Sequence, residues 1–144
     1  MAVLEKPTPI MIQFTLDGHV APKPRMTRRD KWLNPPRPPV ERYRNFAEAL
    51  LLMARSEGYD PEADIITGIR FKAYLRIPAS WGKKKKKALR GKPHMQKPDT
   101  SNILKGIEDA LMAKDETIYY VEGKKLWDDG AGNRVEVTML INRP

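Results

Sequence analysis

Two aspartates flank one expected helix, at the positions of this sequence best placed for chemistry. An apolar stripe predicts the helix over Thr100–Ala113. Pro98 keeps the chain before it extended, so Asp99 is expected on a fixed turn at the start of a rigid element. Asp115 follows the helix, and it can approach Asp99 only if the next strand runs back alongside. The sequence contains no cysteine and two histidines, so oxygen is the better candidate ligand for any metal.

A purely structural role explains the same residues. Asp99 and Ser101 are ordinary capping types, Thr100 or Ser101 can cap the helix, and Lys105–Asp109 has the spacing of a common ion pair. However, Asp99 stands inside a strongly basic region, where an acid weakens phosphate binding unless a metal lies between them.

The formal net charge of +9 is concentrated in one segment. Residues Ile65–Pro98 contain eleven Lys and Arg and no acid, whereas the rest of the chain has 16 basic and 18 acidic residues. A concentrated basic stretch favours a polyanionic partner, because neutralising phosphates releases counterions. We therefore expect a nucleic acid, with an acidic protein, a membrane surface or a merely solubilising loop as alternatives.

The remaining pattern predicts one small α/β (α+β) domain over residues 1–144, with a mixed sheet of about four strands backed by two helices. The expected elements are strands at Ile10–Leu16, Ile65–Ile77, Thr117–Val121 and Val135–Ile141, and helices at Pro39–Gly58 and Thr100–Ala113. No apolar run has the roughly 20 residues of a membrane span, and MAVLEKPTPI lacks the features of a signal peptide. We expect a cytoplasmic protein with no membrane partner.

Two irregular basic segments are expected to reach into solvent. A flexible proline- and arginine-rich arm is predicted at about residues 20–39, where Trp32 adds an aromatic side chain suited to base stacking. A lysine-rich loop is predicted at about residues 79–97, directly before Asp99.

One composite motif resembles a known family. Residues 80–127 read SWGKKKKKALRGKPHMQKPDTSNILKGIEDALMAKDETIYYVEGKKLW. This segment resembles the signature of the RusA family of Holliday-junction resolvases. The shared features are Ser-Trp with following lysines, Lys-Pro-Asp, an Asn with a Lys three residues later, Asp-Ala-Leu, and an acidic segment before a strand with Lys and Trp. Pro22-Lys23-Pro24-Arg25 resembles the family's Pro-Lys-x-Arg element.

The resemblance implies an endonuclease that resolves four-way DNA junctions by paired phosphodiester hydrolysis, with Mg²⁺ as cofactor, Mn²⁺ as a possible substitute, and a homodimer as the working form. Asp99, Lys105 and Asp115 match the catalytic residues, and Asp99 and Asp115 match metal ligands. The residues expected to contact DNA are Lys23, Arg25, Lys83, Lys84, Lys85, Lys86, Lys87, Lys97 and Asn102.

The match leaves the ligand set open. Ser101 stands where the family has an aspartate, and a neutral hydroxyl in its place lowers the charge and the metal affinity of the site. Asp115 best matches the later aspartate, with Lys114 replacing its acidic neighbour. Other registers use Glu116, Asp128 or Asp129, and Asp109 or Glu116 is a possible compensating acid.

Two rival functions share the basic segment. One is a non-catalytic or catalytically weakened protein that binds branched DNA. The other is a nuclease whose substrate is a flap, a replication fork or an RNA hybrid, and composition does not separate these substrates.

Overall fold

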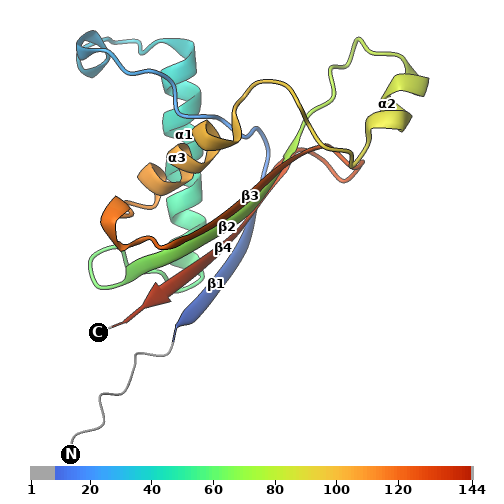
Figure 1. The fold of residues 1–144 in the computed structure, drawn as a ribbon. Helices are drawn as coiled ribbons and strands as arrows, with labels where there is room; N and C mark the ends of the chain where they lie inside the picture. Colours follow the sequence, from blue (N-terminus) through green and yellow to red (C-terminus); the bar gives the residue numbers. More distant parts are fainter. Residues whose placement is uncertain (1–8, 144) are drawn as a thin grey trace, which may run out of the picture.

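The computed structural model describes residues 9–143 and contains a four-stranded mixed sheet with helices on one face (Figure 1). The strands are β1 (Ile10–Asp17), β2 (Ile65–Leu75), β3 (Tyr120–Trp127) and β4 (Arg134–Asn142). The helices are α1 (Pro38–Ser56), α2 (Lys83–Leu89) and α3 (Thr100–Ala110), with 3₁₀ turns η1 (Arg28–Lys31) and η2 (Asp115–Thr117). This architecture confirms the predicted fold class.

The sheet has the order β1-β4-β2-β3. β4 pairs antiparallel with both β1 and β2, whereas β3 adds to the outer edge of β2 in parallel. In β4 every second residue is buried, because Val135, Val137, Met139 and Ile141 face the helices. The same alternation predicted this strand from the sequence.

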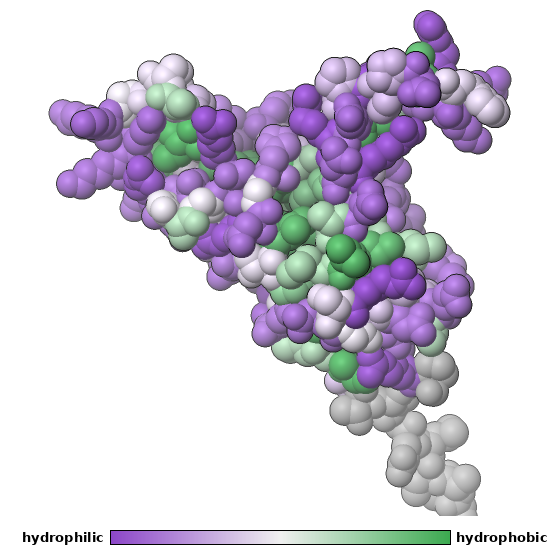
Figure 2. All heavy atoms as spheres, turned by 180° about the vertical axis from the view of Figure 1, so that it is seen from behind, coloured by the Kyte–Doolittle hydropathy of each residue, from purple (hydrophilic) through white to green (hydrophobic). Residues whose placement is uncertain are grey.

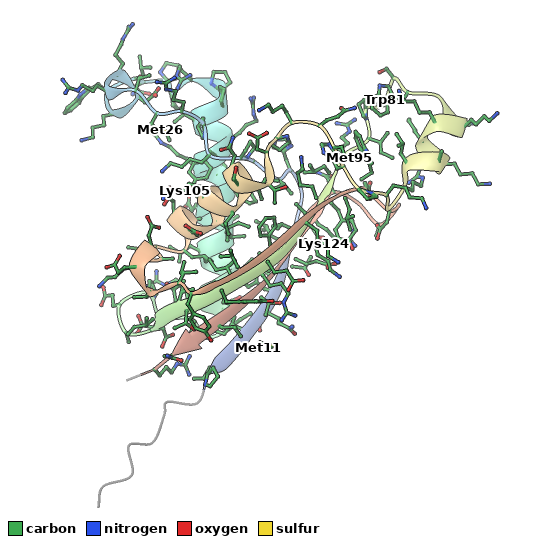
Figure 3. The ribbon with its side chains drawn as sticks, viewed as in Figure 1. Met11, Met26, Trp81, Met95, Lys105 and Lys124 are labelled. Atoms are coloured by element: carbon green, nitrogen blue, oxygen red, sulfur yellow. The ribbon has the colours of Figure 1, made fainter. Side chains whose placement is uncertain are left out.

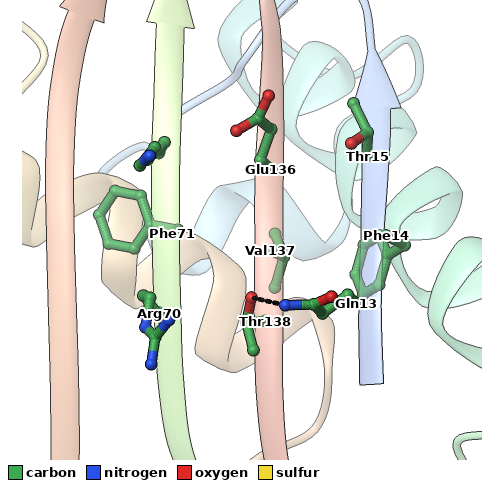
Figure 4. A pocket seen from close by; sticks show the side chains of 9 residues that line it. Gln13, Phe14, Thr15, Arg70, Phe71, Glu136, Val137 and Thr138 are labelled. Carbon is green, nitrogen blue, oxygen red and sulfur yellow. Dashed lines mark hydrogen bonds between the residues drawn. The ribbon is translucent and has the colours of Figure 1, made fainter. Parts of the chain in front are cut away.

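The opposite sheet face carries a polar, shallow hollow of about 410 Å³ (Figure 4). Arg70 and Lys72 of β2 and Glu136 of β4 line it, and Gln13 Nε2 donates to Thr138 Oγ1 at 3.4 Å across β1 and β4. The cationic side of β2 therefore lies on the face away from α3.

The predicted strand at Thr117–Val121 was wrong in extent. Thr117 belongs to η2, and the strand β3 runs from Tyr120 to Trp127. Because β3 is an edge strand whose residues from Val121 to Lys124 are exposed, its sequence has none of the apolar alternation that marks a half-buried strand. Gly123 allows its pairing with β2, since a Cβ there would meet the Phe71 ring at 2.4 Å.

The predicted lysine-rich loop contains a helix, α2, that projects away from the sheet (Figure 1). Lysine has a good helix propensity, and in a short helix exposed to solvent the charges of Lys83–Lys87 are hydrated. Trp81 braces its base, with its ring 5.3 Å from that of Trp127 and Lys85 Nζ 3.8 Å from its centroid. His94 packs 4.1 Å from Trp127, and burial, followed by Lys125, lowers the pKa of its imidazole.

The arm predicted at about residues 20–39 contains the 3₁₀ turn η1 and ends where α1 begins at Pro38, and buried groups fix its course. Val20 and Ala21 join the core, and Asp30 is 3% exposed within η1. The Asp30 carboxylate accepts from Arg37 Nε at 2.8 Å and from the Thr27 N–H at 2.6 Å. These donors hold its pKa well below the usual range, so the carboxylate is charged and compensated.

In residues 9–143, no helix combines the length and the apolar character needed to cross a membrane.

Candidate active site

Close packing of α3 against α1 fixes the position of Lys105. Tyr43 Oη of α1 donates to the Gly106 carbonyl at 2.9 Å. A side chain at Gly106 would place its Cβ 3.2 Å from Tyr43 and 3.3 Å from the backbone nitrogen of Lys23. The glycine therefore allows the arm and α1 to approach α3 beside Lys105.

Lys105 lies between two carboxylates on the exposed side of α3. Its Nζ is 3.5 Å from Asp115 Oδ2 and 3.6 Å from Asp109 Oδ1. Asp109, then Asp115, raises the pKa of Lys105, so this side chain stays protonated at neutral pH. A permanently charged ammonium can stabilise negative charge on a phosphate but cannot serve as a general base. The structure thus brings together the predicted pair Lys105 and Asp115, and it adds Asp109.

Two further residues belong to this cluster. Lys23, from the Pro-Lys-Pro-Arg element, forms an ion pair with Asp109. Glu108 lies close to Asp115, and the pKa of Glu108 is raised by burial and then by the charge of Asp115. The Lys23–Asp109 contact joins residues 86 positions apart, so no local pattern in the sequence reveals it.

Asp99 occupies the N-cap position of α3, but its carboxylate does not cap the helix. Lys97 Nζ donates to both its oxygens instead, at 2.9 and 3.1 Å, and the Asp99 side chain is 50% exposed. The expectation that Thr100 or Ser101 caps the helix was wrong, because both are already helical. The carboxylate is therefore available at the surface, which weakens the capping explanation for this aspartate.

Lys125 holds the turn that carries Asp99. Its Nζ donates to the Gln96 carbonyl at 2.6 Å and to the Pro98 carbonyl at 2.8 Å. β3 thus returns alongside α3, as an approach of the two aspartates requires, but it brings Lys125 to the Asp99 end. Asp115 lies in η2, before β3 begins.

The described residues contain no hydrogen bond or ion pair between Asp99 and Asp115, and no group of three or more acidic or histidine side chains that could hold a metal. Lys105 is six residues beyond Asp99, about 9 Å along the axis of α3. Its Nζ contacts Asp109 and Asp115, so Lys105 belongs to the Asp115 part of the site.

The acids considered as alternative metal ligands have other surroundings. Asp128 Oδ1 accepts from the N–H groups of Gly130 and Gly132 in the β3–β4 turn. Asp129 forms a bidentate pair with Arg134 at 3.0 and 3.1 Å, which lowers its pKa to about 2. Glu116 lies beside Asp115 in η2.

The predicted DNA contacts separate into three places around α3. Lys83–Lys87 form the projecting helix, Lys23 and Arg25 lie on the arm, and Lys97 and Asn102 flank Asp99. Figure 2 shows hydrophilic side chains gathered on both projections, and Figure 3 shows Lys105 on the same side of the molecule as Met26 of the arm, with Trp81 at the base of α2 on the other side. The cluster thus lies beside the arm, which contributes Lys23 to it, and α2 projects at the other side of the molecule.

One of three comparisons with known proteins identifies a family. No curated protein and no solved structure matches the chain. The family model described as endodeoxyribonuclease RusA matches residues 17–139, which include both projections and every residue of the cluster. The family implies nuclease activity on Holliday junctions and, in general, dependence on a divalent metal. The chain belongs to the RusA endodeoxyribonuclease family.

Proposed function

We propose that this protein is a Mg²⁺-dependent endonuclease that resolves four-way DNA junctions by paired phosphodiester hydrolysis. The observation that carries the proposal is a protonated Lys105 beside Asp115, next to the basic arm, in a protein with a second basic projection at α2. A linear duplex needs one continuous basic track, whereas two separate basic projections suit a branched substrate. Phosphate contacts of this kind position DNA by shape rather than by sequence.

The oxygen donors suit a hard divalent cation by type, although in the described residues they are not gathered into one ligand group. Asp99 and Asp115 provide exposed carboxylates and Ser101 provides a hydroxyl, all oxygen ligands of the kind that Mg²⁺ takes. When bound, Mg²⁺ supplies a nucleophilic water and neutralises charge on the phosphate. In this proposal Lys97 and Lys105, the present counterions of the two carboxylates, turn toward the DNA phosphates. Lys105 then stabilises the charge of the transition state.

The test is incubation of the protein with a labelled four-way junction and with linear duplex, in Mg²⁺ and in EDTA. We expect paired cuts in the junction only with Mg²⁺, and junction binding in EDTA that weakens steeply with salt. Equal affinity for the junction and for a duplex of the same length would contradict shape recognition. Faster cleavage of a flap or fork than of the junction would reassign the substrate.

Ser101 supports a second candidate, a catalytically weakened junction-binding protein. A hydroxyl replaces one carboxylate of the family pattern, and we propose that this substitution lowers metal affinity. Ser101→Asp is then expected to lower the Mg²⁺ concentration for half-maximal cleavage about tenfold, because the added charge strengthens the site. The measurement is a Mg²⁺ titration of cleavage rate. Ser101→Asn, which adds bulk without charge, is the control and should not have this effect.

The symmetry of the substrate also leads us to propose a homodimer, with one site per subunit, because resolution requires two related cuts. Sedimentation is expected to show a species above the 16.5 kDa of one chain, with DNA or without. A purely monomeric protein at micromolar concentration in both conditions would contradict this prediction.

A further inference from the structure

An exposed tryptophan stands at the tip of the arm. The Trp32 side chain is 84% exposed, although an indole ring normally contributes more by being buried. It directly follows η1, whose residues Arg28, Arg29 and Lys31 are cationic. An indole left in water among positive charges has no role in the folding of this chain that the structure reveals.

Hydrogen bonds within η1 and its flanking residues hold Trp32 in position. Its backbone N–H donates to the Arg29 carbonyl at 2.9 Å, and the buried carboxylate of Asp30 accepts from Thr27 on one side and from Arg37 on the other. The Arg44 guanidinium donates to the Asp30 carbonyl at 3.3 Å and connects η1 to α1. The ring is therefore presented to solvent from a fixed turn.

Trp32 also borders a shallow hollow of about 480 Å³. Met26 adds apolar surface to its lining, while Arg28, Lys31 and Arg44 add positive charge. Asp30 lines it too, but Arg37 neutralises that carboxylate. A flat apolar surface next to cations matches the chemistry of a nucleotide, which has an apolar ring face and an anionic phosphate.

We propose that Trp32 stacks on a nucleobase exposed at the branch point of bound DNA, while Arg28 and Lys31 bind the adjoining phosphates. This inference rests on the proposed function and makes the arm the part of the protein that distinguishes a branched from a linear substrate. In a continuous duplex both faces of each base are covered by its neighbours. At a branch point the stack is interrupted, so a ring face becomes available to an indole. The arm projects beside α1 and α3, and α2 projects at the opposite side of the molecule (Figure 1).

The test compares Trp32→Ala with Trp32→Phe by gel shift in EDTA, on a four-way junction and on linear duplex. Trp32→Ala is expected to weaken junction binding about tenfold and duplex binding hardly at all, and Trp32→Phe to retain most of the affinity, because a smaller ring still stacks. Arg28→Ala is the matched control for charge, and it should weaken both substrates and lower the salt dependence. Circular dichroism checks folding, which an exposed side chain should not affect.

The outcomes separate this inference from the proposed function. Wild-type protein without a preference for the junction means that the proposed function fails. If the wild-type protein prefers the junction and Trp32→Ala keeps that preference, only the role of Trp32 is overturned. If Trp32→Ala weakens binding to junction and duplex equally, Trp32 does not select the branched substrate and the inference is also overturned. If Trp32→Ala changes the sedimentation of the free protein, Trp32 is a subunit contact and the inference is wrong.

Discussion

Asp99→Asn and Asp115→Asn, each alone, are expected to reduce junction cleavage by at least about 100-fold while leaving junction binding in EDTA unchanged or tighter. Each substitution keeps the size of the side chain but removes a negative charge that faces DNA, so binding loses nothing and metal affinity falls. The measurements are single-turnover cleavage in Mg²⁺ and gel shift in EDTA, with the same labelled junction.

The capping explanation of Asp99 predicts a different result. Asparagine caps a helix about as well as aspartate, so under that explanation Asp99→Asn changes little. Asp128→Asn is the matched control, because Asp128 accepts hydrogen bonds within a turn and lies outside the cluster. Full cleavage by Asp99→Asn would refute the site. Loss of cleavage with Asp128→Asn, and not with Asp115→Asn, would move the second metal ligand to the β3–β4 turn.

Replacement of the three outward lysines of α2, Lys83, Lys84 and Lys87, by glutamine is expected to weaken junction binding on the order of 100-fold at 0.1 M salt. Each lost phosphate contact removes about 0.9 from the slope of log affinity against log salt, so three contacts remove roughly 2.7. Lys85 and Lys86 stay in place, because Lys85 packs on Trp81 and Lys86 Nζ donates to the Ala79 carbonyl at 3.0 Å. Gel shifts at several salt concentrations measure both quantities.

The control for this variant is the pair Lys72→Gln and Lys124→Gln. Both lysines lie on the sheet face away from α3, at paired positions of β2 and β3. Their removal should leave the salt slope nearly unchanged. The control pair could instead lower the slope of log affinity against log salt by as much per lysine as the α2 variant does. In that case the charge of the protein as a whole attracts DNA, and the α2 lysines contribute no more than other lysines.

The sequence by itself determined the helices, turns and strands that depend on local residue patterns. The apolar stripe of α1, the turn at Gly58 and the alternation in β4 were predicted because each depends on residues a few positions apart. Pro98 placed Asp99 at the start of α3 for the same local reason. The lysine run of α2 was predicted as a loop, because repulsion between the lysines disfavours an isolated helix and the packing of Trp81 on the distant Trp127 leaves no local pattern.

Only the tertiary structure decided which charges meet. The parallel pairing of β3 with β2 carries Lys125 to the Pro98 carbonyl, and the close approach at Gly106 brings Lys23 to Asp109. The sequence named Lys105 and Asp115 through the resemblance of their motif, but their contact depends on how η2 folds back beside α3. Such contacts join residues far apart in the chain, so their geometry is set by the packing of whole elements, which no local pattern records.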